Sequence, residues 1–215
     1  PEIAVASTKA YTTQVVVMNL LGMYFADLKG ILDKDVEKEL KESLLSLPEK
    51  IEAVLEMKSQ VAEVSKILAE ETDLFYLGRG ADYALVIEGA LKVKEISYVH
   101  SEAYAGGELK HGTIALIEPG TKVIAALTQS QLKDKMISNV KEVTTRGGNI
   151  LAIVNDGDES AKNITDDVIY IPKTIDLLTP LLSVIPLQLL SYYIAKLKGC
   201  DVDKPRNLAK SVTVE

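Results

Sequence analysis

The sequence predicts an α/β protein built on a parallel β-sheet with helices on both faces. Short apolar segments alternate with longer helical segments through the second half of the chain, which is the pattern of successive βα units. One apolar segment, 74–77, also runs directly into Gly78-Arg79-Gly80 and then into a helix. A strand, a glycine-rich turn and a helix in that order are typical of doubly wound folds. With two glycines only, a tight bend without a ligand is as good an interpretation of the turn as a phosphate site.

The first seventy residues predict mainly helices. The expected elements are, in order, a strand end over 1–6, a helix over about 9–28 capped by Ser7 or Thr8 and stopped by Gly30, and two charged amphipathic helical segments over 33–47 and 48–68. The two amphipathic segments form a helical connector without evident chemistry.

The remaining elements complete the alternation. They are strands over 74–77, 123–127, 150–154 and 168–171, and helices over 84–96, 131–146 and 179–198, the last with Pro180 in its first turn and a kink expected at Pro186. Ligands of such sheets bind beyond the carboxyl ends of the strands. We therefore expect Arg79, the loop 106–112 and residues 128–130 to lie near one another.

Composition narrows the class of protein. The chain has 215 residues, a net charge of −7 and a pI near 5.0, and this acidic balance argues against a nucleic-acid surface. The one cysteine, Cys200, excludes an internal disulfide and fits a reducing compartment, so we expect a cytoplasmic protein. The uncharged run 177–195 is long enough to raise the question of a membrane span, but its prolines and polar residues predict a buried helix instead. Because the chain begins at Pro1, we expect it to be a piece of a larger protein.

Three charges stand on the otherwise apolar helix 84–96. Glu88, Lys92 and Glu95 are spaced i, i+4 and i+7 and therefore share one face. A solvated ion pair is one interpretation, but charges on a buried helix are rare unless they are paired or functional. The same stretch continues through Gly106 and Gly107 to Lys110 and His111. A carboxylate, a lysine and a histidine around a bend indicate proton-transfer chemistry.

The last fifteen residues read DVDKPRNLAKSVTVE. A terminal segment is often disordered, whereas its apolar residues, Leu208, Ala209, Val212 and Val214, could dock it and fix Lys210. The residues alone leave both possibilities open.

Three segments carry a resemblance to a known family. They are EIAVASTKAYTT at the front, EGALKVKEISYVHSEAYAGGELKHG in the middle, and VIPLQLLSYYIAKLKGCDVDKPRNLAKSVTVE at the end. Together they resemble the isomerase part of the glutamine–fructose-6-phosphate aminotransferases, the glucosamine-6-phosphate synthases. The resemblance implies a flavodoxin-like, three-layer αβα sugar isomerase (SIS) domain with a five-stranded parallel sheet. It divides the chain into a remnant of a first SIS domain (1–30), a helical connector (31–70), a second SIS domain (71–199) and a catalytic tail (200–215).

The resemblance also implies a reaction and four catalytic residues. The family converts fructose 6-phosphate and ammonia into glucosamine 6-phosphate. Lys210 matches the lysine that forms a Schiff base with the open-chain ketose, and Glu95 matches the base that moves a proton between C1 and C2. Lys92 matches the lysine that assists proton movement at the sugar oxygens. His111 matches the ring-opening histidine, which reaches the site from the neighbouring subunit, so a homodimer is expected.

Further expectations concern binding. The sugar is expected to contact Val5, Ala6 and Ser7, together with Glu88 and Ala209. No metal, organic cofactor, nucleic acid or membrane is expected, and Cys200 is given a packing role. The family's glutaminase domain is a further expected partner that this chain lacks. The family's serine- and threonine-rich phosphate loop, which belongs to the first SIS domain, is also missing. Residues 128–132 lack the glycine and hydroxyls to replace it. This chain is therefore expected to be inactive by itself.

Two other functions remain open. One is a non-catalytic SIS module that senses a sugar phosphate or dimerises, which would need the phosphate loop but not Lys210 or Glu95. The other is a different phosphosugar isomerase of the same fold, which the NLAKSVTVE tail argues against.

Overall fold

The computed structural model describes residues 3–209. Five parallel strands form one sheet in the order β2-β1-β3-β4-β5, the flavodoxin-like order that the resemblance implies. The strands are β1 (Asp73–Gly78), β2 (His100–Ala105), β3 (Lys122–Ala126), β4 (Asn149–Asn155) and β5 (Val168–Ile171). The α-helices are α1 (Lys9–Leu28), α2 (Lys34–Leu45), α3 (Leu47–Leu55), α4 (Lys58–Leu68), α5 (Ala81–Ser97), α6 (Lys133–Thr144) and α7 (Thr179–Leu197). Three short 3-10 helices are η1 (Leu109–His111), η2 (Thr113–Leu116) and η3 (Ser160–Asn163).

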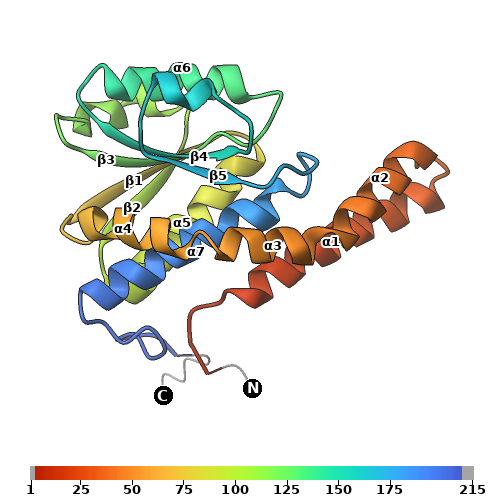
Figure 1. Ribbon diagram of the computed structural model, residues 1–215, viewed down its shortest axis with the longest axis horizontal. Coiled ribbons are helices and arrows are strands. Elements are labelled where there is room, and N and C mark those ends of the chain that lie inside the picture. Colours follow the sequence, from red (N-terminus) through yellow and green to blue (C-terminus); the bar gives the residue numbers. More distant parts are fainter. Residues whose placement is uncertain (1–2, 210–215) are drawn as a thin grey trace.

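The helices make the two outer layers. Helices α4, α5 and α7 pack on one face of the sheet and α6 covers the other (Figure 1). Each face has its own apolar core: Val86 and Val93 of α5 pack with α7 on the first, while Val140 of α6 packs on the second. The αβα architecture predicted from the sequence is confirmed.

Helix α7 is the central helix of the first layer. By length and composition it is the one helix among the described residues that could cross a membrane, but 67% of its apolar window is buried inside the protein. It contacts α3, α4 and α5, and it passes through Pro186 without a break. Its hydropathy is therefore that of a core helix, as the sequence analysis expects.

The strands differ from the prediction in two places: the strand end expected at the start of the chain is absent from residues 3–6, and the strand β2 was not expected from the pattern. Residues 3–6 form no strand; instead the backbone N–H of Val5 donates to the carbonyl of Asp203 at 3.0 Å. Thr8 precedes α1 but its side chain makes no capping hydrogen bond. Strand β2, which the pattern did not reveal, follows α5 after the left-handed residue Tyr98. It is an edge strand whose inward positions include Ser101, too polar to be recognised as a strand core.

Two helical boundaries also differ from the prediction. The segment 48–68 is two helices, α3 and α4, separated at Glu56 and Met57. Helix α2 and helix α1 form a hairpin that extends away from the sheet (Figure 1). Asp33 caps α2 by accepting hydrogen bonds from the N–H groups of Asp35 and Val36 at 2.9 and 3.1 Å.

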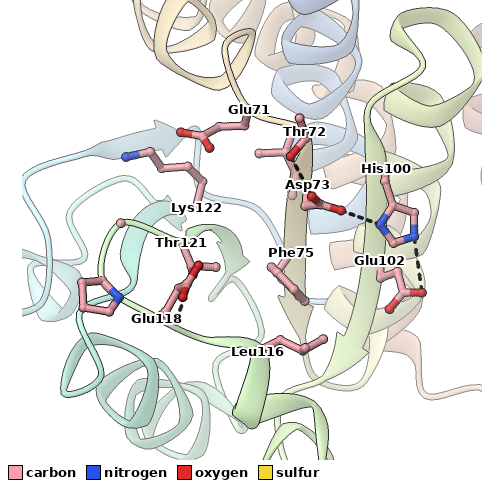
Figure 2. A pocket seen from close by; sticks show the side chains of 13 residues that line it. Glu71, Thr72, Asp73, Phe75, His100, Glu102, Leu116, Glu118, Thr121 and Lys122 are labelled. Carbon is pink, nitrogen blue, oxygen red and sulfur yellow. Dashed lines mark hydrogen bonds and ion pairs between the residues drawn. The ribbon is translucent and has the colours of Figure 1, made fainter.

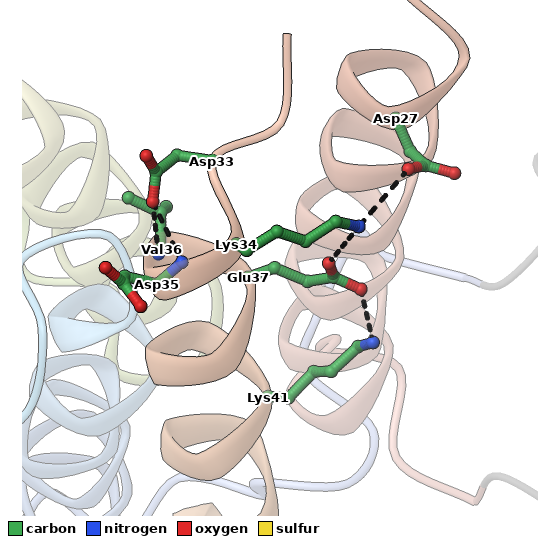
Figure 3. A network of polar contacts seen from close by, with 7 residues as sticks. All are labelled: Asp27, Asp33, Lys34, Asp35, Val36, Glu37 and Lys41. Carbon is green, nitrogen blue, oxygen red and sulfur yellow. Dashed lines mark hydrogen bonds and ion pairs between the residues drawn. The ribbon is translucent and has the colours of Figure 1, made fainter. Parts of the chain in front are cut away.

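Ion pairs tie this hairpin together (Figure 3). Lys34 Nζ lies 3.9 Å from Asp27 Oδ1 of α1 and 2.9 Å from Glu37 Oε2 of α2. Lys41 also binds Glu37, and hydrogen bonds from the two lysines lower the pKa of Glu37 to about 2. Of these pairs, Lys34–Asp27 joins α2 to α1, and because it is exposed it adds little to stability.

A buried carboxylate joins the start of α5 to the loop after β3. Asp82 is 2% exposed and accepts hydrogen bonds from the N–H of Thr128 at 2.7 Å, the hydroxyl of Thr128 at 2.5 Å and the N–H of Gln129 at 3.3 Å. Burial raises the pKa of Asp82, while these hydrogen bonds act in the opposite direction. The contact fixes the carboxyl edge of the sheet.

We predict that Asp82→Ala lowers the free energy of unfolding by about 2 kcal/mol, because two backbone donors and a hydroxyl lose their acceptor inside the protein. Urea unfolding measures the change. The control is Asp166→Ala, an exposed loop carboxylate, which should change stability by less than about 0.5 kcal/mol. Equal effects of the two variants would contradict the structural role given to Asp82.

Candidate functional site

The three charges of α5 lie together, as the sequence predicts. Lys92 Nζ is 2.5 Å from Glu95 Oε2 and 3.4 Å from Glu88 Oε1. The Lys92 side chain is 4% exposed, that of Glu88 13% and that of Glu95 22%. A lysine so deeply buried stays charged only with anionic partners beside it. The solvated-pair interpretation is therefore wrong: the three groups form a half-buried charge cluster with Glu95 nearest to solvent.

Helix α7 packs closely against α5 next to the charge cluster. Gly89, beside Glu88, faces α7 so closely that a Cβ at this position would lie 2.8 Å from Leu187 Cδ1. Leu85, Ala90 and Val93 of α5 are buried in the same apolar core as Leu187. The cluster therefore borders a tightly packed helix interface.

Burial changes the pKa of Glu88. It raises the pKa of this carboxyl above its ordinary value of 4.5, with Lys92 acting in the opposite direction and Glu95 adding to the rise. Tyr11 of α1 lies near the same carboxyl, and burial followed by the Glu88 charge raises the pKa of the Tyr11 phenol above 10.0. Helix α1 therefore brings Tyr11 close to the charge cluster. The sequence analysis did not predict this neighbour.

Glu95 opens into a cavity beneath the C-terminal segment. The cavity has a volume of about 280 Å³ and is lined by Leu91, Lys94, Glu95, Tyr98, Arg206, Asn207 and Leu208. Within the described part of the tail, Cys200 and Arg206 contact the end of α5, at Ser97 and Tyr98. Of the apolar residues that the sequence suggested, Leu208 is 42% exposed and Ala209 is exposed, whereas Val212 and Val214 lie outside the described residues. Lys210 lies outside the described residues.

The predicted sugar-contacting segment lies beside this tail. Val5, Ala6 and Ser7 are half-buried, and the hydrogen bond from Val5 to Asp203 joins the two segments. The structure therefore brings together Glu88, Lys92 and Glu95 on α5, and pairs the N-terminal segment with the tail. Cys200 is half-buried at the end of α7, with its Sγ 4.0 Å from the carbonyl oxygen of Ser97.

His111 is not part of this group. It is exposed on η1, and its neighbour Leu109 belongs to the core on the α6 face of the sheet. Glu95 belongs to α5 on the opposite face. Within one chain the sheet stands between the faces from which these two side chains arise.

The carboxyl edge of the sheet is organised as predicted but is already occupied by the chain itself. A Cβ on Gly107 would lie 2.8 Å from Arg79 Nη1, which donates to Asn139 Oδ1 at 2.8 Å. Asp82 holds Thr128 and Gln129, as described above. Asp176 accepts hydrogen bonds from the N–H and hydroxyl of Ser130 at 2.9 and 2.5 Å. The donors of loop 128–130 are satisfied by internal carboxylates, which supports the expectation that this loop does not replace a phosphate loop.

A larger cavity lies elsewhere, at the amino ends of β1, β2 and β3 (Figure 2). It has a volume of about 650 Å³. His100 lies there between two carboxylates, with Nδ1 2.8 Å from Asp73 Oδ1 and Nε2 3.6 Å from Glu102 Oε1. Hydrogen bonds from Thr72 and His100 hold the pKa of Asp73 below 3.8. These polar groups bind one another and are well exposed, so we place the candidate site at the buried cluster on α5 and not here. The described residues contain no group of three or more metal-binding side chains.

Comparison with known proteins agrees with this geometry. The SIS domain family matches residues 67–197, more than half of the chain. The chain is 59% identical over its whole length to the glutamine–fructose-6-phosphate aminotransferase (isomerizing) of Clostridium acetobutylicum and 60% identical to that of Clostridium tetani. It spans 35% of the length of each of these relatives.

Solved structures give the same result. The C-terminal domain of glucosamine-fructose-6-phosphate aminotransferase from Francisella tularensis has a TM-score of 0.89 and 38% sequence identity, over 95% of this chain and 58% of that one. A glucosamine-6-phosphate deaminase from Thermotoga maritima has a TM-score of 0.72 and 25% identity, over 98% of this chain and 58% of that one. The chain belongs to the SIS domain family and corresponds over its whole length to the C-terminal part of the glutamine–fructose-6-phosphate aminotransferases.

Proposed function

We propose that this chain is the C-terminal isomerase part of an enzyme that makes glucosamine 6-phosphate from fructose 6-phosphate and ammonia. The observation that carries the proposal is the buried cluster on α5, in which Lys92 contacts both Glu88 and Glu95 and Glu95 opens into the cavity under the tail. A phosphosugar-binding or dimerisation module has no need of a buried lysine between two carboxylates. The cost of burying these charges is explained by chemistry at the site.

The proposed reaction assigns one step to each catalytic residue. His111 opens the sugar ring, and the Lys210 amine attacks the C2 carbonyl and releases water to form an imine. Ammonia then displaces the lysine, leaving an imine at C2. The Glu95 carboxylate moves a proton from C1 to C2, while the O1 hydroxyl loses its proton and the imine nitrogen gains one. The products are a C1 aldehyde and a C2 amine, which close to glucosamine 6-phosphate.

Each supporting residue has a proposed role in this scheme. Lys92, whose Nζ donates to Glu95 Oε2, assists the proton at O1. Glu88 balances Lys92 from the buried side. Val5, Ala6, Ser7 and Ala209 contact the sugar, a role supported by the pairing of residue 5 with the tail. The scheme uses no metal and no organic cofactor.

We propose that the site is completed by a second copy of the chain. His111 and Glu95 arise from opposite faces of the sheet, which supports the expectation that His111 serves the site of the neighbouring subunit in a homodimer. The glutaminase domain of the relatives is the proposed source of ammonia, and a cytoplasmic location is proposed from the half-buried free Cys200.

Helix α1 supports the proposed division of the chain. None of its twenty residues, all of them described, is fully buried, although it exposes seven large apolar side chains, namely Val17, Met18, Leu20, Leu21, Tyr24, Phe25 and Leu28. A helix that is apolar on all sides is normally buried. We propose that residues 1–30 complete a first SIS domain, with 31–70 as connector, 71–199 as second SIS domain and 200–215 as catalytic tail. On this proposal the chain by itself has little activity, because the first domain supplies the phosphate site.

Borohydride trapping tests the proposed function. Fructose 6-phosphate and borohydride are added to this chain and to an extended protein in which the preceding part of the Clostridium acetobutylicum relative is joined to residue 1. We expect mass spectrometry to find a reduced sugar adduct on Lys210 in the extended protein.

Lys210→Arg should abolish the adduct, and Lys204→Arg, a control in the same tail, should retain it. An adduct that persists in Lys210→Arg would rule out the Schiff-base role. Sugar binding by the extended protein without any adduct would instead favour a phosphosugar-binding module.

Glu88 predicts a specific pH dependence. Because its folded pKa is raised above 4.5, the folded state binds more protons than the unfolded state immediately above pH 4.5, and this contribution to stability falls as pH rises through that window. Glu88→Gln should therefore show a smaller loss of unfolding free energy between about pH 4.5 and 6 than the native chain. Denaturant unfolding at several pH values measures it, with Glu49→Gln, on the exposed side of α3, as the control. Parallel pH profiles of native protein and Glu88→Gln would contradict the cause given for the pKa shift.

A further inference from the structure

Tyr98 attaches the C-terminal segment at two points. Its hydroxyl accepts a hydrogen bond from the backbone N–H of Arg206 at 2.8 Å. The guanidinium of the same arginine lies over its ring, 4.0 Å from the centroid, a cation–π contact. One aromatic side chain therefore holds both the backbone and the side chain of a residue 108 positions later.

The backbone of Tyr98 is itself unusual. It ends α5 in the left-handed region, with φ 62° and ψ 15°, a conformation that costs a non-glycine residue about 1 kcal/mol or more. A glycine would adopt it freely. The contacts of the side chain with Arg206 offer a physical reason for a tyrosine at this position.

Arg206 is the last point at which the described tail is firmly held. Before it, Pro205 is buried and the carbonyl of Asp203 binds Val5. After it, residues 207–209 are exposed, and their backbone N–H groups make no hydrogen bond to the rest of the described chain. The Tyr98–Arg206 contact is therefore the anchor closest to residue 210.

The anchor also lies beside the proposed base. Tyr98 follows the end of α5, three positions after Glu95, and Tyr98, Arg206 and Glu95 line one cavity. We propose that Tyr98 is a positioning residue: it holds the tail at Arg206, beside Glu95, and thereby promotes the reaction of Lys210 with the substrate. The consequence for Lys210 rests on the proposed function, whereas the anchoring of the tail does not.

Trypsin cleavage tests the anchoring in the 215-residue chain. Cleavage after Arg206 removes the tail, whereas Lys204 is protected by the following proline. Tyr98→Phe keeps the ring and loses the hydrogen bond, so the rate of cleavage after Arg206 should rise about fivefold. Tyr98→Leu loses both contacts and should raise it roughly twentyfold.

The matched control is Tyr192→Phe. Tyr192 lies on α7 with Lys196 Nζ 5.6 Å from its ring, a tyrosine–cation pair away from the tail, and this substitution should leave the cleavage rate unchanged. The thermal unfolding midpoint of Tyr98→Phe should match that of the native chain. An unchanged cleavage rate in both Tyr98 variants would overturn the anchor.

The effect on Lys210 is measured in the extended protein by the initial rate of borohydride-trapped adduct at saturating fructose 6-phosphate. Tyr98→Leu should lower this rate at least fivefold, and Arg206→Lys, which keeps the charge but not the planar stack, should fall between it and the native protein. If cleavage shows that Tyr98 anchors the tail, but Tyr98→Leu leaves the adduct rate unchanged, the positioning role is overturned. Absence of adduct in the native extended protein would overturn the proposed function and the positioning role, while the cleavage rates would still decide the anchor.

Discussion

The charge cluster on α5 depends on one constraint, which is that a lysine ammonium buried to 4% exposure must have anionic neighbours. Glu88 and Glu95 provide them at i−4 and i+3, positions that only a continuous helix brings to the same face. Helix α7 packs on the neighbouring face so tightly that Gly89 leaves no space for a side chain. Burial thus turns three residues of types that usually stand in water into a partly desolvated charge cluster.

The sheet holds α5 and α7 in position, because both helices pack on the same face of it. Its parallel order places α5 between β1 and β2 in the chain and α7 after β5, yet both helices lie on one face. Asp82 locks the first turn of α5 to the loop after β3, so the helix is fixed at the end farthest from Glu95. The end held by Asp82 lies at the carboxyl edge of the sheet, where related folds bind ligands, and the end that carries Glu95 lies near the contact of Tyr98 with Arg206.

Much of this arrangement could be predicted from the sequence, for identifiable reasons. Strands rich in valine and isoleucine, such as Val168–Ile171, and the helical spacing of Glu88, Lys92 and Glu95 are local patterns that tertiary structure preserves. Strand β2 escaped because its inward positions are serine and alanine, whose short side chains suit close contact with α5: Ser101 donates to the carbonyl of Ala90 at 2.8 Å. The contacts of Tyr98 could not be predicted, because its partner is Arg206 and no sequence periodicity relates residues so far apart. The same limit applies to Tyr11, whose position near Glu88 follows from the course of α1 and not from its own neighbours in the sequence.

The hydrogen bond between Val5 and Asp203 couples the two extremities of the described chain. Movement of residues 5–7 must therefore carry the segment around Asp203 with it or break this hydrogen bond. Because Arg206 contacts Tyr98 at the end of α5, the N-terminal segment is coupled to the end of that helix through residues 203–206.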